Sequence, residues 1–221
     1  MTGAGGDTDL PLLLALDTST STASLALFDG QQVLSETTWL AGREHSTRLL
    51  VEVEIALERV GRTPSDLTGL VVARGPGSFT GVRVALSVAK GMAAGLGIPA
   101  WGVGSLEVLA LAAQPSELPV RAVIEAGRGR YATAVFSNTM QVSEARLATI
   151  DQLVALVCEP TVVIGEVRAG DRRVMLLNEH VKLAPVAASA RRAGFLAELG
   201  RRLVDSGAPG DARALDAVYV T

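Results

Sequence analysis

The sequence is poor in the residues that most often ligate metals or form covalent cross-links. Its 221 residues include one cysteine, Cys158, and two histidines, His45 and His180. A single cysteine excludes a disulfide framework and a cysteine-based metal cluster. Because Cys158 lies in the apolar segment LVALVCEP, we expect a buried core thiol. The two histidines are far apart in sequence, so we predict neither a metal site nor a catalytic residue set.

Aromatic residues and long apolar runs are also scarce. Aromatics make up 4% of the chain and the net charge is −3, which argues against a chain-wide nucleic-acid surface. Small arginine clusters leave local RNA contact open, although Arg191 and Arg192 at the last predicted helix are expected on a solvated face. No stretch reaches the ~20 apolar residues that a membrane span needs. Residues 1–9 lack the pattern of a secretory signal, so we expect a flexible tail on a cytoplasmic protein without membrane contact.

Small and aliphatic residues are abundant, with an apolar content of 48% and a charged content of 19%. This composition indicates a globular chain with a core of Ala, Leu and Val. Among the small residues, residues 74–81 read RGPGSFTG, between an apolar run at 70–73 and a predicted helix at 82–96. Such a turn can direct backbone N–H groups at a phosphate. It can equally be only a tight connection between a strand and a helix.

The loop matches no standard phosphate motif. Val82 follows the last glycine where a Walker A loop requires lysine, and Thr80 stands where a Rossmann fingerprint requires glycine. A second polar turn, at 17–20, is better placed for nucleotide binding, but it can equally be a simple polar turn. The residues that we predict for nucleotide binding are Asp17, Thr18, Ser19, Gly75, Gly77 and Ser78.

The order of predicted elements repeats. Apolar and periodic patterns predict strands at 10–16, 23–28, 32–39, 70–73 and 98–103, with helices at 43–60, 82–96 and 106–113. After a connector at 114–119 they predict strands at 120–125, 130–136, 141–148 and 161–165, with helices at 151–157 and 191–204. Each half thus contains the order β-β-β-α-β-α, which in the first half is followed by the strand at 98–103 and the helix at 106–113. This is the layout of a two-lobed α/β fold of the actin-like ATPase (ASKHA, ribonuclease H-like) class, with lobes at 10–113 and 119–221 and a last helix that can pack back on the first lobe.

The duplication places two acids at matching points. Asp17 ends the first strand and Glu125 ends the fourth strand of the meanders, so we expect them to face each other across a cleft.

The helix at 82–96 carries a line of small residues. Ser87, Gly91 and Gly95 recur every four residues, and each interior glycine costs about 1 kcal/mol relative to alanine. Small residues let another helix approach closely. The stripe therefore predicts either close packing within the chain or a face that, with the helix at 43–60, meets another chain.

Several segments, in this order, resemble the bacterial TsaB (YeaZ) family. They are 14–20 (LALDTST), 43–46 (REHS), 74–83 (RGPGSFTGVR), 89–91 (AKG), 97–99 (GIP) and the ending 216–220 (DAVYV). The glycine-rich segment followed by Arg83 is the most specific of them. Where Glu125 stands the family usually has aspartate, so the resemblance assigns no role to Glu125.

The resemblance implies a non-catalytic subunit of the complex that transfers a threonylcarbamoyl group to N6 of adenosine 37 in tRNAs reading ANN codons. The implied partners are the catalytic subunit TsaD and the ATPase TsaE, with a self-dimer when the chain is alone and tRNA reached mainly through the complex. No cofactor is implied for the chain itself, with ATP or ADP confined to the assembled complex. The implied interface lies on the helices at 43–60 and 82–96, through His45, Leu49, Leu50, Val53, Arg83, Ser87 and Gly91.

A different class of function stays open. The Asp17 turn and the duplicated layout are also compatible with an actin-like, ATP-dependent small-molecule kinase or ATPase.

Overall fold

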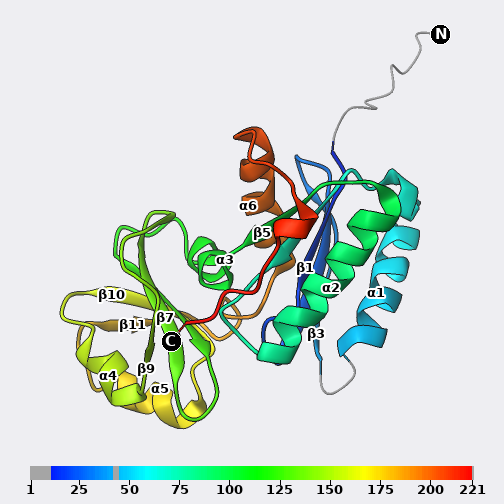
Figure 1. The fold of residues 1–221 in the computed structure, drawn as a ribbon. Coiled ribbons are helices and arrows are strands. Elements are labelled where there is room, and N and C mark those ends of the chain that lie inside the picture. The colour runs from blue at the N-terminus through cyan, green and yellow to red at the C-terminus, as the bar shows by residue number, and fades with distance from the viewer. Residues whose placement is uncertain (1–10, 42–44, 221) are drawn as a thin grey trace.

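The computed structural model describes residues 11–41 and 45–220, with side chains described from residue 48 onward after the gap, and contains two sheets (Figure 1). The first sheet has the order β3-β2-β1-β4-β5, from strands β1 (Leu13–Asp17), β2 (Thr22–Phe28), β3 (Val33–Leu40), β4 (Gly69–Ala73) and β5 (Ala100–Val103). The second has the order β11-β10-β6-β7-β8, with β9 also paired to β7, from strands β6 (Val120–Glu125), β7 (Tyr131–Ser137), β8 (Met140–Gln141), β9 (Arg146–Ala148), β10 (Thr161–Gly165) and β11 (Val181–Leu183).

The two sheets follow the same plan. In the first, β1 pairs antiparallel with β2 and parallel with β4, which pairs parallel with β5. In the second, β6 pairs antiparallel with β7 and parallel with β10, which pairs parallel with β11. The predicted duplicated α/β fold is therefore confirmed.

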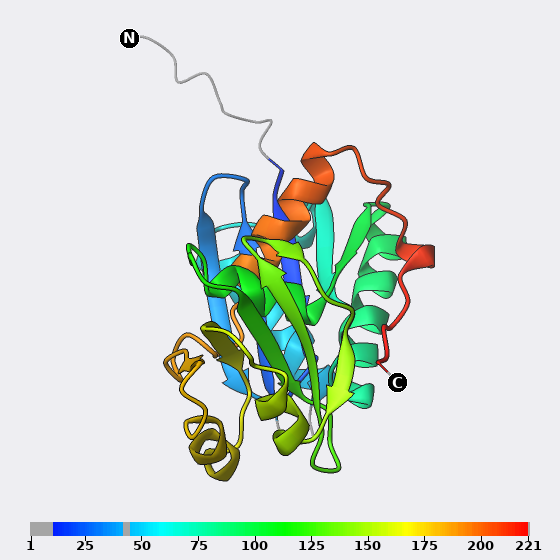
Figure 2. The same ribbon diagram turned by 90° about the vertical axis from the view of Figure 1, so that its left-hand side faces the viewer.

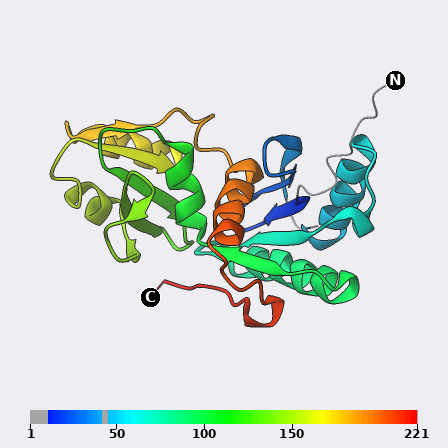
Figure 3. The ribbon, with the colours of Figure 1, turned by 90° about the horizontal axis from the view of Figure 1, so that it is seen from above.

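Both faces of the first sheet are covered at its centre, where β1, β2 and β4 are buried, whereas the edge strand β3 is largely half-buried or exposed. Leu14 and Leu16 pack under α1 (His45–Arg59) and α2 (Phe79–Leu96), while Leu13 and Ala15 pack under α6 (Ala193–Asp205). Seen from above, α6 lies between the first sheet and the second half of the chain, and α1 lies on the far side (Figure 3). The last helix of the chain thus belongs to the core of the first sheet.

The helix that ends the first half of the chain packs on the second sheet, just as the last helix packs on the first sheet. Leu106 and Leu109 of α3 (Ser105–Ala112) pack on Val120, Ala122 and Ile124 of the second sheet. The opposite face of that sheet is covered by the short helices α4 (Ile150–Ala155) and α5 (Ala169–Met175). Because α3 and α6 also contact each other, the two halves are joined by two crossing helices (Figure 2).

Several details differ from the sequence-based prediction. The strand predicted at 141–148 is two short strands, β8 and β9, and the segments α5 and β11 were not predicted. Short 3-10 turns occur at Pro64–Asp66 and Ala212–Ala214. The prediction of a buried thiol is wrong: Cys158 is exposed, because α4 ends at Ala155 and the chain turns outward before Pro160.

Two further predictions concern the N-terminal residues and membrane-spanning segments. Residues 1–9, predicted as a tail, lie outside the described residues. Within the described part of the chain, no helix has both the length and the apolar character needed to cross a membrane.

Candidate functional site

The glycine-rich loop packs directly on the turn that follows β1. The backbone N–H of Ser78 donates to the carbonyl of Ser19 at 2.6 Å, and the Thr18 hydroxyl donates to the carbonyl of Gly81 at 2.6 Å. A Cβ atom on Gly77 would lie 2.1 Å from the Ser19 carbonyl oxygen, and one on Gly81 would lie 2.0 Å from that of Thr18. The glycines are therefore required because the backbone of the neighbouring turn occupies the space of a side chain.

The C-terminal segment covers the other side of the same loop. The backbone N–H of Val218 donates to the carbonyl of Arg74 at 2.7 Å. Gly75 has a φ of +98°, and a Cβ atom there would lie 2.6 Å from the Val218 carbonyl oxygen. Both the conformation and the close contact favour glycine at this position.

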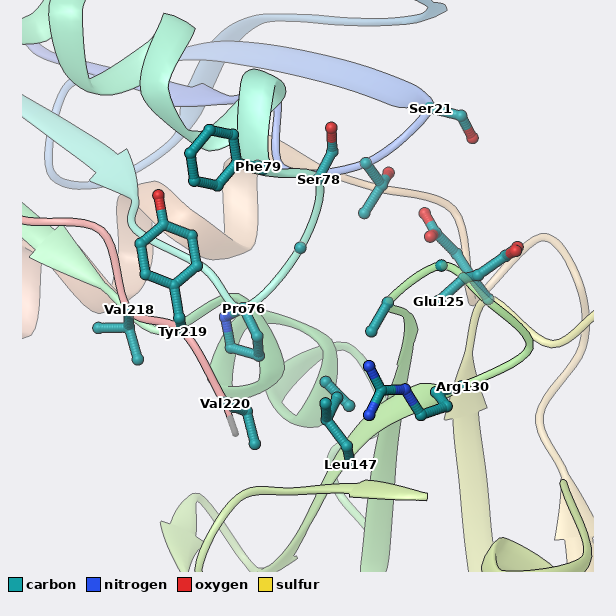
Figure 4. Close-up of a pocket in the computed structure, with 16 residues that line it drawn as sticks. Ser21, Pro76, Ser78, Phe79, Glu125, Arg130, Leu147, Val218, Tyr219 and Val220 are labelled. Carbon is teal, nitrogen blue, oxygen red and sulfur yellow. The ribbon is translucent and has the colours of Figure 1, made fainter. Parts of the chain in front are cut away.

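A cavity of about 620 Å³ opens between the two halves beside this loop. Figure 4 shows Ser78 and Phe79 on one side, Glu125, Arg130 and Leu147 on the other, and residues 218–220 near the loop. Of the six residues predicted to bind nucleotide, Gly77 and Ser78 line this cavity. The other four, namely Asp17, Thr18, Ser19 and Gly75, are buried and do not line it.

The carboxylate of Asp17 makes its contacts within the fold, although its buried Oδ2 has no hydrogen-bond partner among the described residues. Its Oδ1 accepts hydrogen bonds from the backbone N–H of Ser19 at 2.8 Å and from the Ser19 hydroxyl at 2.6 Å. Its Oδ2 lies 3.5 Å from Nη1 of Arg191, whose side chain is fully buried. The expectation that Arg191 lies on a solvated face is wrong, since this residue precedes α6 at the junction of the two sheets.

The predicted pair of Asp17 and Glu125 does not form. Glu125 lines the cavity, but its Oε1 is 2.7 Å from Nη2 of Arg168. The acid that approaches Arg191 from the second half is Glu166, with Oε1 3.8 Å from Nε. Glu166 follows β10 directly, so the carboxyl end of a parallel strand in each sheet supplies one acid to the same arginine.

The wall of the cavity in the second half is held by polar contacts. The Tyr131 hydroxyl donates to Asp171 and accepts from the backbone N–H of Arg168 at 3.3 Å. Burial, and then the hydrogen bond to Asp171, raise the pKa of Tyr131 to about 12. The hydrogen bond to Glu125 raises the pKa of Arg168. These contacts fix the end of β6, which carries Glu125, against Arg168 at the start of α5.

Several polar groups of the loop and of the turn after β1 are already paired within the chain. The Ser78 N–H is bonded to Ser19, the Gly81 N–H is bonded to the Ser78 hydroxyl at 3.3 Å, and Asp17 faces an arginine. A phosphate loop instead leaves such N–H groups free for the ligand. In the described part of the chain, no cluster of three His, Cys, Asp or Glu side chains is arranged to hold a metal ion.

The predicted interface residues on α2 lie on an open surface. Arg83, Ser87 and Gly91 are all exposed, whereas Ala85 and Ala89 face the sheet. A Cβ atom built on Gly91 or on Gly95 would meet no atom within 4 Å. The glycines of this stripe therefore do not serve close packing within the chain.

Helix α1 contributes differently to the predicted interface. Leu49 and Val53 are buried in the core, while Leu50 is 51% exposed. The side chain of His45 lies outside the described residues. A groove of about 620 Å³ runs between α1 and α2, lined by Leu50, Val53, Glu54, Leu57, Glu58, Arg62, Thr63, Pro64, Met92, Gly95 and Leu96. The groove is mainly apolar, with acidic groups from α1.

One cluster beside the cavity was not predicted as a unit. The guanidinium of Arg83 lies 3.6 Å from the ring centroid of Phe79, and its Nε donates to the Tyr219 hydroxyl at 3.2 Å. The rings of Phe79 and Tyr219 are 5.5 Å apart. Tyr219 is distant in sequence from the other two residues, so its contact with them could not be predicted. The four-residue spacing of Phe79 and Arg83 was the local signal that these two side chains can meet on one face of a helix. The cluster connects the C-terminal segment to the start of α2.

Comparisons with known proteins give consistent results. Residues 38–170 match the family model described as "TsaD: tRNA N6-adenosine threonylcarbamoyltransferase". The chain is 36% identical over 124 residues to the tRNA threonylcarbamoyladenosine biosynthesis protein TsaB of Bacillus subtilis. This match covers 56% of the chain and 54% of the relative, so it spans about half the length of that curated relative.

Similarity to solved structures extends over nearly the whole chain. YeaZ from Pseudomonas aeruginosa superposes with a TM-score of 0.76 and 26% identity, covering 96% of this chain and 100% of that one. The ROK hexokinase of Thermus thermophilus gives a TM-score of 0.51 at 14% identity, covering 88% of this chain and 99% of the hexokinase, which shows a shared fold alone.

Proposed function

The chain belongs to the family described as TsaD, tRNA N6-adenosine threonylcarbamoyltransferase, and within it to the TsaB (YeaZ) proteins, and from this premise we propose that it is a non-catalytic partner subunit in threonylcarbamoyladenosine synthesis. Its role is to bind and activate a catalytic TsaD subunit. That subunit modifies N6 of adenosine 37 in tRNAs that read ANN codons, and the ATPase TsaE joins the assembly. tRNA is reached through the complex.

The observation that carries this proposal is the open face of α2. Two glycines in one helix weaken it by about 1 kcal/mol each, and neither Gly91 nor Gly95 contacts anything in the chain that would offset this cost. A second helix seated on Arg83, Ser87 and Gly91 could approach closely, and the exposed Leu50, which lines a groove with Met92 and Gly95 of α2, offers further apolar surface. The face therefore suits a partner helix.

The groove beside this face adds a chemical preference. Glu54 and Glu58 of α1 border its apolar lining. A partner helix with small or aliphatic residues toward α2 and a basic residue toward α1 would complement both features. We propose that TsaD supplies such a face, and that a second copy of this chain takes the same place when TsaD is absent.

The site between the halves supports a non-catalytic role. Backbone atoms of the chain occupy the space beside the loop glycines where a ligand could otherwise approach. Asp17 has an arginine as its counter-ion. We propose that nucleotide binds only in the assembled complex.

The first test measures threonylcarbamoyladenosine in tRNA from cells that lack this chain. We expect the modified nucleoside to be lost and then restored by the wild-type chain. Normal levels in the deleted strain would refute the proposal.

The same assay tests the α2 face through the variant Gly91→Trp. Its matched control is Gly170→Trp, because Gly170 is also an exposed helical glycine with no atom within 4 Å of a Cβ. Gly170→Trp should restore the nucleoside, whereas Gly91→Trp should not.

The alternative, an ATP-dependent kinase or ATPase, rests on the cavity beside the N-terminus of α2. It predicts that the isolated chain binds ATP and transfers or releases phosphate. Calorimetry with ATP and Mg²⁺ on the isolated chain separates the two proposals, since the partner-subunit proposal predicts no binding heat until TsaD and TsaE are added.

A further inference from the structure

A fully buried arginine lies where the two halves of the chain meet. The carbonyl of Arg191 accepts a hydrogen bond from the Thr38 hydroxyl of β3 at 2.9 Å. Its Nη1 donates to the carbonyl of Ser105, the first residue of α3, at 3.1 Å. Since α6 begins two residues later on the first sheet, both ends of Arg191 are fixed relative to that sheet and to the crossing helices.

The charge of this arginine faces one acid from each half. Asp17 Oδ2 is 3.5 Å from Nη1, and Glu166 Oε1 is 3.8 Å from Nε. Asp17 is held in place by Ser19, but the Glu166 side chain is 24% exposed and lines the cavity. Among the described side chains, those of residues 11–41 and 48–220, no other ion pair connects a group fixed on the first sheet to one carried by the second.

The contact with Glu166 is only partly made. A hydrogen bond between a guanidinium and a carboxylate has a length of about 2.7–2.9 Å, so the 3.8 Å separation is about 1 Å too long. Nε and Nη2 of Arg191 are buried and have no hydrogen-bond partner among the described residues. Buried donors without partners are unfavourable, so movement of Glu166 toward Arg191 is stabilising. Water can replace Arg191 at the partly exposed carboxylate of Glu166.

From this geometry we propose that Arg191 and Glu166 form a latch that sets the opening of the cavity between the halves. Asp17 and the Ser105 carbonyl hold Arg191 in position, and Glu166 is the movable partner. When Glu166 bonds Arg191, the second sheet is drawn toward the first. When the carboxylate turns to water, the halves separate about the crossing helices α3 and α6. The latch concerns the cavity and is independent of the partner face on α2.

The test measures the width of the cavity directly. Spin labels are attached at Ser21→Cys and Arg130→Cys, which line the cavity from opposite halves, in a Cys158→Ser background. Pulsed electron double resonance then gives the distribution of label distances. We expect Glu166→Ala to lengthen the mean distance and broaden the distribution, and Glu166→Gln to shift it less in the same direction.

The matched control is Glu125→Ala, since Glu125 also lines the cavity but pairs with Arg168 inside the second half. It should leave the distribution unchanged. A second label pair, Ser21→Cys with Ser65→Cys, lies within the first half and reports whether that half stays folded. Identical distributions in the parent and in Glu166→Ala, or an equal shift in Glu125→Ala, would overturn the latch.

Discussion

The glycines at the two ends of one segment have opposite surroundings. Gly77 and Gly81, in the loop that begins α2, lie against backbone atoms of the turn after β1. Gly91 and Gly95, in the second half of the same helix, face open space. The first pair serves the fold of this chain, because nothing larger fits. The second pair has no function within the chain, which is why we assign it to contact with a partner.

The largest expected effect lies on the buried side of this comparison. Arg191→Met would leave Asp17 charged and buried without its counter-ion, and breaking a buried pair in this way costs about 3–5 kcal/mol. Denaturant unfolding should show that loss. The double variant Asp17→Asn, Arg191→Met removes both charges and should recover part of it. If both variants were as stable as the wild type, the pair of Asp17 and Arg191 would make no contribution to the free energy of unfolding.

The next largest effect is expected in the glycine-rich loop itself. Gly77→Ala forces a methyl group against the Ser19 carbonyl, so the loop or the turn must move, and we expect a loss of about 1–3 kcal/mol. Thermal unfolding would measure it as a lower Tm. A Tm equal to that of the wild type would mean that the loop tolerates a side chain and that its glycines have another purpose.

A glycine-to-alanine substitution on the open face of α2 should stabilise the chain, whereas the same substitution in the loop should destabilise it. Gly91→Ala adds a methyl group where no atom lies within 4 Å, and alanine favours a helix by about 1 kcal/mol over glycine. The isolated chain should therefore gain stability in denaturant unfolding. A loss of stability would show that Gly91 is packed against the chain after all, and the comparison would fail.

The fold was largely predictable because its signals are local. Apolar runs and turn residues indicated β1, β4, β6 and β10, and the repeated order of elements indicated the duplication. The segments α5 and β11 have only 7 and 3 residues, too few for a clear period, so the prediction omitted them. Cys158 was misplaced because an apolar pattern does not show where a helix ends.

The site was less predictable because it depends on contacts between distant segments. Arg191 and Arg192 are neighbours in sequence, yet the side chain of the first is fully buried and that of the second is 55% exposed. Nothing local separates them, and only the meeting of the strand ends at Asp17 and Glu166 places Arg191. On α2 the period indicated a line of small residues at Ser87, Gly91 and Gly95, but not whether that line packs within the chain or faces outward.

The most direct test of the central claim is the affinity of this chain for a TsaD subunit, the partner that we propose. Isothermal titration calorimetry should compare the wild type with Gly91→Trp and with Gly170→Trp, after circular dichroism has shown that all three are folded. The account predicts that Gly91→Trp loses measurable binding while Gly170→Trp binds like the wild type. Unchanged binding by a folded Gly91→Trp variant would contradict the assignment of the α2 face to a partner.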